Sequence, residues 1–370
     1  MSRNCTTERT NGAGTASVHR GRTPVRRMAG SSLGFSCGAF SGTILDNIAN
    51  AHRQGAGFNP LRCNGGSNIF DDGAVGLNFE HIFSGEKADS HLAYFTPRTD
   101  SCVLEQSDQP GNFVVRHPAA SSAWGIESTM RYTCSDQLER PHIDLEFTAT
   151  LTSDRALSHG WVAFMWASYM GHAASREIYF RGERRGGELN TWVAFGSEDV
   201  VVESSTDVVQ SAHGGSFERG TVGWAGAAPL PHDAAPRPRE NSSGPSPLLN
   251  VLESPTARFS RPFFFGLMQD QVTDRLMVYA MFFESAECHR FAMWNFKRNE
   301  YGQPDPHHPA WDWQFVVKHP QVGKEYSYRA RVVYKQFVSA EDVEGDYDAW
   351  ISELHNKNSS GGAEVKSSNL

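Results

Sequence analysis

From residue 52 onward, short runs of alternating apolar and polar residues follow one another with turn residues between them. The clearest run is HIDLEFTATLT at 142–152, where the alternation is strict and typical of an antiparallel strand with one buried and one solvated face. Further strands are predicted at 77–83, 91–96, 112–117, 126–134, 191–195, 263–268, 275–283, 290–296, 311–318 and 326–337. Because almost no helix interrupts them, the chain is predicted to be all-β, a large antiparallel β-sandwich.

Three further features belong to the description of the predicted domain, which covers 52–354. One C-terminal helix is predicted, because Ser339 and Asp342 form a capping signal and apolar residues then recur at helical spacing. The tail at 355–370 is polar and is expected to be disordered. A Pro/Gly-rich segment at 204–258 interrupts the strands, and it is interpreted either as a surface loop bordering a site or as plain disorder.

The segment HGWVAFMWASYMGHAASREIYFR at 159–181 concentrates aromatic, histidine and charged residues in two predicted strands. Alternation places His159, Trp161 and Tyr169 on one face of the first strand, with small residues between them, and Phe164 and Trp166 on the other. The face of Phe164 and Trp166 is predicted to be core. The opposite face is interpreted as the floor of a groove for a sugar ring, with Trp161 and Tyr169 as stacking surfaces, and an ordinary sandwich strand is the alternative.

The second strand of this segment adds a row of three polar groups. One face of this strand carries Glu177, Tyr179 and Arg181. Their predicted roles are a carboxylate base or acid for Glu177, a proton donor for Tyr179 and a substrate clamp for Arg181. A solvated face carrying an Arg–Glu pair is the alternative interpretation.

Histidines supply the other candidate acid–base groups, because imidazole titrates near neutrality. The residues predicted in this role are His81, His159 and His172. In GLNFEHIF at 76–83, a fully extended strand would place Glu80 and His81 on opposite faces, so only one of the two is expected in a given cleft.

Two later strands carry further candidate binding residues. In WDWQF at 311–315 the tryptophans share one face, so Trp311 is either a stacking surface or a core residue, while Asp312 takes the other face as an undistinguished carboxylate. In 326–337, Arg329 belongs to a row of cationic side chains. That row suits an acidic sugar, and it equally suits the wet outer face of a sheet.

Composition narrows the function classes. The net charge of −8 provides no basic surface, so no nucleic acid is expected as a partner, and no apolar run is long enough for a membrane span. Aromatic residues make up 11% of the chain, which suits both a large core and sugar stacking. Nucleotide-binding, serine-hydrolase and zinc-binding motifs do not occur in the sequence, so no cofactor and no metal are expected.

The first 51 residues resemble an export signal. Several arginines, the last two being Arg26 and Arg27, precede a weakly apolar run at 28–45 and an A-N-A site at 49–51. The pair Arg26 and Arg27 resembles an export signal of the twin-arginine type. We therefore expect 1–51 to be a disordered leader of an exported, periplasmic or extracellular protein, and the alternative is a cytoplasmic protein with a disordered leader. The later cysteines are expected as buried thiols or as one or two disulfides.

Several segments within about 76–334 resemble a group of uncharacterised bacterial proteins found beside polysaccharide-degrading genes. These segments are GLNFEHIFSG, WGIESTMRY, HGWVAFMWASYM, IYFRG and PAWDWQFVV. In strand succession the chain also resembles the galactose-mutarotase-like super-sandwich of aldose epimerases, several polysaccharide lyases and domains of glycoside hydrolases. This resemblance implies carbohydrate on a concave sheet face. In such epimerases a histidine opens an H-x-Y-F-N strand; His159 opens a comparable strand without Y-F-N, and Glu284 is a downstream glutamate without a matching motif.

The sequence thus predicts a carbohydrate-active enzyme. It would cleave the glycosidic bonds of a polysaccharide or oligosaccharide, as a hydrolase or a lyase, by His/carboxylate acid–base chemistry. A non-catalytic carbohydrate-binding or scaffold protein is the first alternative. A sugar epimerase, which needs a His and a Glu that face each other across one pocket, is the second.

Overall fold

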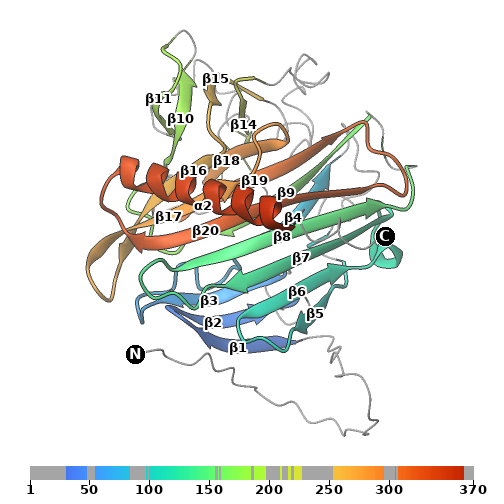
Figure 1. The fold of residues 1–370 in the computed structure, drawn as a ribbon, viewed down its shortest axis with the longest axis horizontal. Helices are drawn as coiled ribbons and strands as arrows, with labels where there is room; N and C mark the ends of the chain where they lie inside the picture. The colour runs from blue at the N-terminus through green and yellow to red at the C-terminus, as the bar shows by residue number, and fades with distance from the viewer. Residues whose placement is uncertain are drawn as a thin grey trace, which may run out of the picture.

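A computed structural model shows two layers of β-strands with a helix against the outside of one layer (Figure 1). The structure describes residues 31–47, 55–83, 97–98, 100–154, 157, 160–184, 187–196, 209–210, 216–217, 221–226, 253–295, 305 and 307–361. The strands of the two layers pair antiparallel, except that β14 and β15 run parallel. The predicted all-β class, with large antiparallel sheets and a C-terminal helix, is confirmed.

The larger layer runs from β5 across to β11. In spatial order its strands are β5 (Val103–Gln106), β6 (Asn112–His117), β7 (Ile126–Cys134), β8 (His142–Leu151), β20 (Glu325–Gln336), β17 (Arg275–Phe283), β16 (Phe263–Asp270), β10 (Ile178–Arg184) and β11 (Thr191–Phe195), and β15 (Glu253–Phe259) also pairs with β10. A short 3-10 turn, η1 (Ala119–Ser121), lies between β6 and β7. The strands predicted at 112–117, 126–134, 191–195 and 275–283 have those bounds.

The smaller layer is built around β9. Its strands are β4 (Asn78–Phe83), β9 (Trp161–Tyr169), β19 (Pro309–Lys318), β18 (His289–Asn295), β12 (Val209–Gln210), β13 (Ser216–Phe217) and β14 (Thr221–Trp224). Since β14 pairs with β18 in this layer and with β15 in the other, it joins the two layers into one continuous sheet. The strand predicted at 91–96 lies outside the described residues.

Aromatic side chains fill the space between the layers. Trp166 of β9 stacks on Trp313 of β19 at 5.6 Å, and both rings meet the larger layer at Phe147 and Tyr328. Trp166 and Trp313 are 0% exposed, so the core face of the smaller layer is completely covered. Burial of such large rings is the main stabilising contribution in this core.

The segment predicted as a leader contributes two strands to the fold. β1 (Ser32–Cys37), β2 (Phe40–Leu45) and β3 (Gly57–Cys63) form a separate three-stranded sheet. Its ring Phe35 packs edge-on against Phe113 of β6 at 5.1 Å. Residues 31–47 of the predicted leader are therefore part of the described fold, which corrects the predicted start at residue 52, and residues 1–30 lie outside the described part of the chain.

Two other predicted boundaries also change. The segment 204–258 contains β12, β13, β14, a turn at 225–226 and the first residues of β15, and its other residues are not described. The helix α2 (Ala340–Gly361) continues beyond the predicted end at residue 354. It therefore includes the first residues of the tail that was expected to be disordered. Its start is as predicted, because the Ser339 hydroxyl accepts a hydrogen bond from the Asp342 amide at 3.2 Å.

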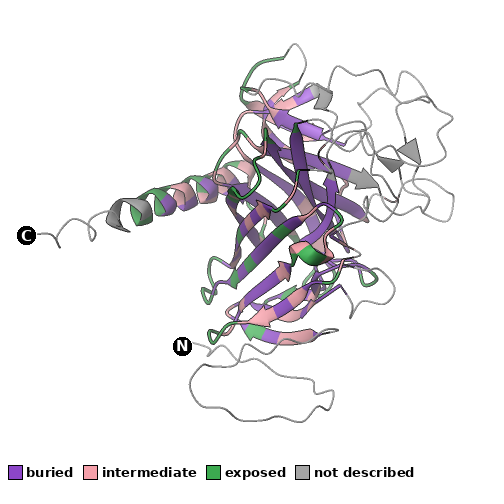
Figure 2. Ribbon diagram, turned by 90° about the vertical axis from the view of Figure 1, so that its right-hand side faces the viewer, coloured by how far each residue is buried: buried purple, intermediate pink, exposed green. Residues whose placement is uncertain are grey.

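The helix α2 covers the outer face of the larger layer (Figure 2). Tyr347 and Trp350 pack there on Phe263 and Phe282, with ring centroids 5.1 to 6.2 Å apart. The two outer faces of the sandwich therefore differ. We call the outer face of the larger layer the helix face and that of the smaller layer the floor.

Candidate functional site

The two faces of β9 have the roles that alternation predicts. Val162, Phe164 and Trp166 lie in the core, whereas Trp161, Met165 and the small residues between them point to the floor. Trp161 is only 1% exposed, so it contributes to a buried surface rather than to an open stacking platform. The predicted groove residue His159 lies outside the described residues.

A β-bulge in β4 changes the predicted arrangement of Glu80 and His81. Phe79 lies opposite Trp166 of β9 and His81 lies opposite Met165, so Glu80 is an extra residue between these two pairs. A bulge of this kind re-aims side chains. Both Glu80 and His81 point to the floor, with Glu80 Oε1 3.6 Å from His81 Nε2, whereas an unbroken strand would have separated them.

Glu80 is held as a buried carboxylate. It is 3% exposed, and its oxygens accept hydrogen bonds from the Tyr169 hydroxyl at 2.7 and 2.9 Å and from the Arg98 guanidinium. Burial by itself would raise the pKa of Glu80, but the charge of Arg98 and then that of His81 outweigh it, so the pKa is lowered. Glu80 is therefore ionised at neutral pH.

Asp312 of β19 is the second carboxyl group of the floor, and its pKa is shifted in the opposite direction. It is 1% exposed, and burial, followed by the negative charge of Glu80, raises its pKa well above the ordinary value. Its Oδ1 has no hydrogen-bond partner among the described residues. Burial therefore favours the neutral, protonated form of Asp312. Two carboxyl groups whose surroundings push their pKa values apart are a typical acid–base arrangement.

Tyr169 connects these groups to the end of β9. The burial of its hydroxyl and the nearby charge of Glu80 raise the pKa of Tyr169 well above its usual value, so the hydroxyl keeps its proton. Since that proton is donated to Glu80, Tyr169 orients the carboxylate. Its ring is half-buried, and its role as a stacking surface stays a prediction.

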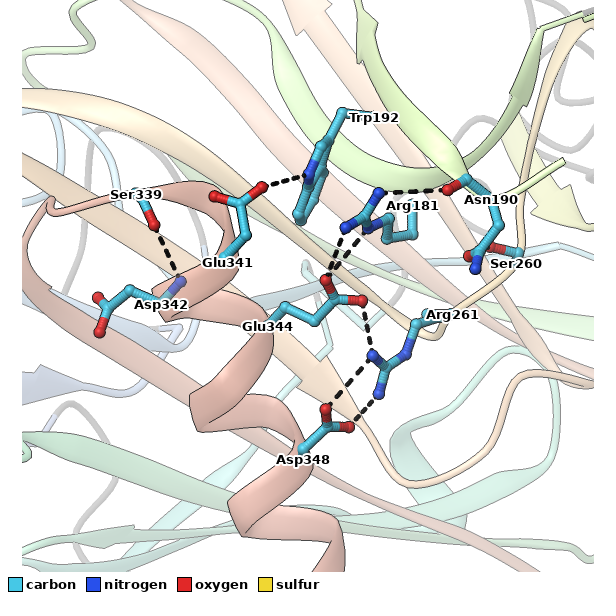
Figure 3. A network of polar contacts seen from close by, with 10 residues as sticks. All are labelled: Arg181, Asn190, Trp192, Ser260, Arg261, Ser339, Glu341, Asp342, Glu344 and Asp348. Carbon is cyan, nitrogen blue, oxygen red and sulfur yellow. Dashed lines mark hydrogen bonds and ion pairs between the residues drawn. The ribbon is translucent and has the colours of Figure 1, made fainter. Parts of the chain in front are cut away.

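The predicted row of Glu177, Tyr179 and Arg181 lies on the other side of the sandwich. Tyr179 stacks on Phe265 at 5.3 Å in the apolar cluster beneath α2, and Glu177 lies just before β10. The Arg181 guanidinium donates to Glu344 of α2 at 3.0 and 3.1 Å (Figure 3). Both layers separate this row from the floor, so it cannot form one pocket with β9.

Two further predicted binding residues are also structural. Trp311 is 0% exposed on the core face of β19, and its indole nitrogen donates to the Arg176 carbonyl at 2.9 Å. Arg329 lies on the helix face, where its Nε is 2.7 Å from Glu284 Oε2. Glu284 is the glutamate that the sequence comparison with epimerases considered as a downstream base. Its ion pair with Arg329 places it on the opposite side of the sandwich from β9.

His172 belongs to a separate cluster beyond the end of β9. Its ring centroid lies 6.3 Å from that of His308, whose Nδ1 is 3.1 Å from Asp71 Oδ2. Burial, and then the neighbouring His308, lower the pKa of His172. Of the three predicted histidines, only His81 is placed on the floor by the described structure.

The helix face carries a groove of 180 Å³ between α2 and strands β8 and β20. Two of its cations, Arg331 and Lys335, are paired with neighbouring carboxylates. Arg331 binds both oxygens of Asp144 at 2.6 and 3.0 Å and also contacts Glu353, and Lys335 lies 2.5 Å from Asp346. This groove is lined by internally neutralised ion pairs, so it is a weaker candidate than the floor.

The described residues contain no group of three or more His, Cys, Asp or Glu side chains arranged to hold a metal ion. No described helix is both long and apolar enough to cross a membrane. The groups on which the floor depends are Glu80, His81, Arg98, Tyr169 and Asp312. Sequence reasoning missed Arg98, which is distant along the chain, and it gave Asp312 no special role, although alternation in 311–315 places that carboxyl group away from the tryptophans.

Comparisons with known proteins give similarities in structure only. No protein-family model and no curated protein matches the chain. Among solved structures, the chain is similar to a putative aldose 1-epimerase from Escherichia coli, with a TM-score of 0.41, 6% identity, and coverage of 83% of this chain and 99% of that one. The protein HI1317 matches with a TM-score of 0.36 and 9% identity over 90% of this chain and 100% of that one.

A third match is the GH36 alpha-galactosidase AgaA from Geobacillus stearothermophilus in complex with raffinose. Its TM-score is 0.32 at 10% identity, and the match covers 83% of this chain and 41% of that one. Similarity at this level carries no information about chemistry, so the chemistry of this chain has to follow from its own residues.

Proposed function

We propose that the chain is a carbohydrate-active enzyme that cleaves glycosidic bonds by acid–base catalysis on the floor. The observation that carries this proposal is a pair of buried carboxyl groups on one sheet face whose pKa values are shifted in opposite directions, that of Glu80 downward and that of Asp312 upward. Breaking a glycosidic bond requires a proton for the departing oxygen and a base for the attacking group. A neutral Asp312 supplies the first, and His81 supplies the second.

The roles follow from the contacts. In hydrolysis Asp312 donates its proton to the glycosidic oxygen as the bond from that oxygen to the anomeric carbon breaks, and the neutral form of His81 accepts a proton from the attacking water. In an elimination His81 instead accepts the proton of C5, the C4=C5 double bond forms, and the bond that breaks is the one from C4 to the glycosidic oxygen, which Asp312 protonates. The Glu80 carboxylate, with Oε1 3.6 Å from His81 Nε2, stabilises the imidazolium that forms. Tyr169 and Arg98 fix the orientation of Glu80.

The test is to incubate the purified chain with neutral and acidic polysaccharides and to measure new reducing ends and ultraviolet absorbance of unsaturated uronate. Reducing ends alone indicate a hydrolase, and reducing ends with absorbance indicate a lyase. Asp312→Asn keeps the shape of the side chain and removes the proton, so we expect turnover to fall about a hundredfold or more. Asp144→Asn, a carboxyl change on the helix face, is the matched control and should leave turnover unchanged.

Sugar epimerisation is the second candidate, because the bulge brings a glutamate and a histidine to one face. An epimerase uses an acid and a base to open and close a sugar ring without cleaving a glycosidic bond. Polarimetry on freshly dissolved single anomers distinguishes it, since rotation would then change faster with the chain and no reducing ends would appear. Binding without either signal would instead favour a carbohydrate-binding or scaffold protein.

A further inference from the structure

Two buried cysteines lie against each other where the three-stranded sheet of β1, β2 and β3 meets the larger layer. Cys37 is the last residue of β1, and Cys134 is the last residue of β7. The Cys37 Sγ atom is 3.5 Å from the carbonyl oxygen of Cys134, although the two residues are 97 positions apart in the chain. Both cysteines are in the thiol form.

A glycine beside the two cysteines shows how closely their side chains approach. A Cβ atom added at Gly111 would lie 3.0 Å from the Cβ atom of Cys37 and 3.3 Å from that of Cys134. The two cysteine Cβ atoms are therefore no more than about 6.3 Å apart, and a disulfide needs about 3.5–4.5 Å. The turn that follows Cys37 is equally close to the end of β7, because a Cβ atom at Gly38 would clash with the Ser135 carbonyl oxygen. A disulfide here requires only a small adjustment of the chain.

We propose that Cys37 and Cys134 form an intramolecular disulfide that ties the three-stranded sheet to the larger layer. The bond is independent of the proposed function. The three-stranded sheet is separate from the larger layer and contacts it through side chains, such as Phe35 on Phe113. A covalent bond at this contact resists the separation of the two sheets.

Thiol–disulfide exchange with glutathione disulfide as the oxidant forms the bond. One cysteine thiolate attacks a sulfur of glutathione disulfide, which breaks the S–S bond of the oxidant and releases one glutathione thiolate. The second cysteine thiolate attacks the resulting mixed disulfide, so the bond between the two cysteine sulfurs forms and the second glutathione leaves. The two cysteines are together oxidised by two electrons, and their two protons end on the two glutathione thiols.

Burial determines when this exchange takes place. Cys37 is 3% exposed and Cys134 is 5% exposed, so glutathione disulfide does not reach either sulfur in the folded chain. The bond therefore forms while the chain folds, and the same packing then protects it from reduction. Because the bond closes a loop across 97 positions, it restricts the unfolded chain strongly.

The experiment refolds the full chain from urea, once with a glutathione redox buffer and once with dithiothreitol, and counts the remaining thiols by alkylation of the denatured chain. The sequence has six cysteines, so we expect six thiols after dithiothreitol and four after glutathione. Trypsin should then release a disulfide-linked pair of the peptides 28–53 and 132–155, each of which contains one cysteine. The urea midpoint of the oxidised chain should be higher by about 1 M than that of the reduced chain.

Cys37→Ser removes one partner, so the linked peptides should disappear and the urea midpoint should be the same after both refolding conditions. Cys288→Ser is the matched control, because it removes a half-buried thiol between β17 and β18 and should leave the linked peptides unchanged. Peptide mapping of the unsubstituted chain decides the question even if a variant does not refold. Absence of the linked pair after refolding with glutathione, or an oxidised chain with no higher midpoint than the reduced one, would each overturn the proposal.

Discussion

The ion pair between Arg98 and Glu80 gives the sharpest test of how the floor is held together. Arg98→Met removes the guanidinium and keeps a long apolar side chain, while Glu80 remains 3% exposed with its other contacts intact. Removing one partner of a buried pair typically costs about 3–5 kcal/mol, because the remaining charge is buried without compensation. We expect the free energy of unfolding at pH 7 to fall by this amount.

The stability loss caused by Arg98→Met should also depend on pH, in a direction that follows from the pKa of Glu80. In the unchanged chain the folded pKa of Glu80 is lowered, so its contribution to stability is present above the unfolded pKa and is lost as pH falls through the folded value. Without Arg98, burial is expected to raise the folded pKa of Glu80 above the unfolded one. The deficit of Arg98→Met should therefore be largest at pH 7 and should shrink as the pH is lowered toward 5.

Urea denaturation followed by tryptophan fluorescence at pH 7 and at pH 5 measures both quantities. The double variant Arg98→Met with Glu80→Gln removes the stranded charge, so it should be more stable than Arg98→Met alone. A deficit below about 1 kcal/mol for Arg98→Met at pH 7, or a double variant less stable than Arg98→Met, would refute the picture of a charge-compensated buried carboxylate.

Three further predictions test other parts of the fold. His117 is buried and its pKa is lowered to about 4 by burial, so the unfolded chain takes up a proton that the folded chain does not. Between about pH 6.5 and pH 4 the chain should lose about 3 kcal/mol of stability from this residue, and His117→Phe should flatten that slope in denaturation titrations. Gly266→Ala places a methyl group 2.2 Å from the Trp311 ring, so it should destabilise by about 1–3 kcal/mol in thermal unfolding. Glu344→Gln weakens two partly exposed ion pairs of α2, so the loss by urea denaturation should be about 1 kcal/mol, and a loss above about 3 would show a more strongly coupled network.

Much of the sandwich could be predicted because strand periodicity is local. The strict alternation in β8 and the segregation of Trp166 from Trp161 in β9 both follow from side-chain direction alone, and both are found. The strands β1 and β2 were missed because their small and polar residues resemble a flexible leader. Their burial depends on Phe58 and Phe113, which are distant in sequence and which no local pattern connects to them.

The site could be predicted only in part, because it depends on three nonlocal events. A bulge re-aims Glu80, Arg98 reaches back to that carboxylate, and the pairing of β19 with β9 sets Asp312 beside it. None of these leaves a spacing signature in the sequence. The row of Glu177, Tyr179 and Arg181 was predicted from the local alternation of side chains along one strand. Alternation shows which residues share a face of the strand, but it does not show which part of the chain packs on that face.

The two outer faces of the sandwich use their polar residues in opposite ways, and the proposed function rests on this difference. On the helix face, carboxylates of α2 meet Arg181, Arg261 and Lys335 at ion-pair distance. Charges matched within the chain serve the packing of α2. On the floor, Asp312 has a shifted pKa and a buried oxygen with no partner among the described residues. Such a group is costly to bury without a partner, and the proposed function gives it one by assigning Asp312 the role of proton donor to a substrate oxygen.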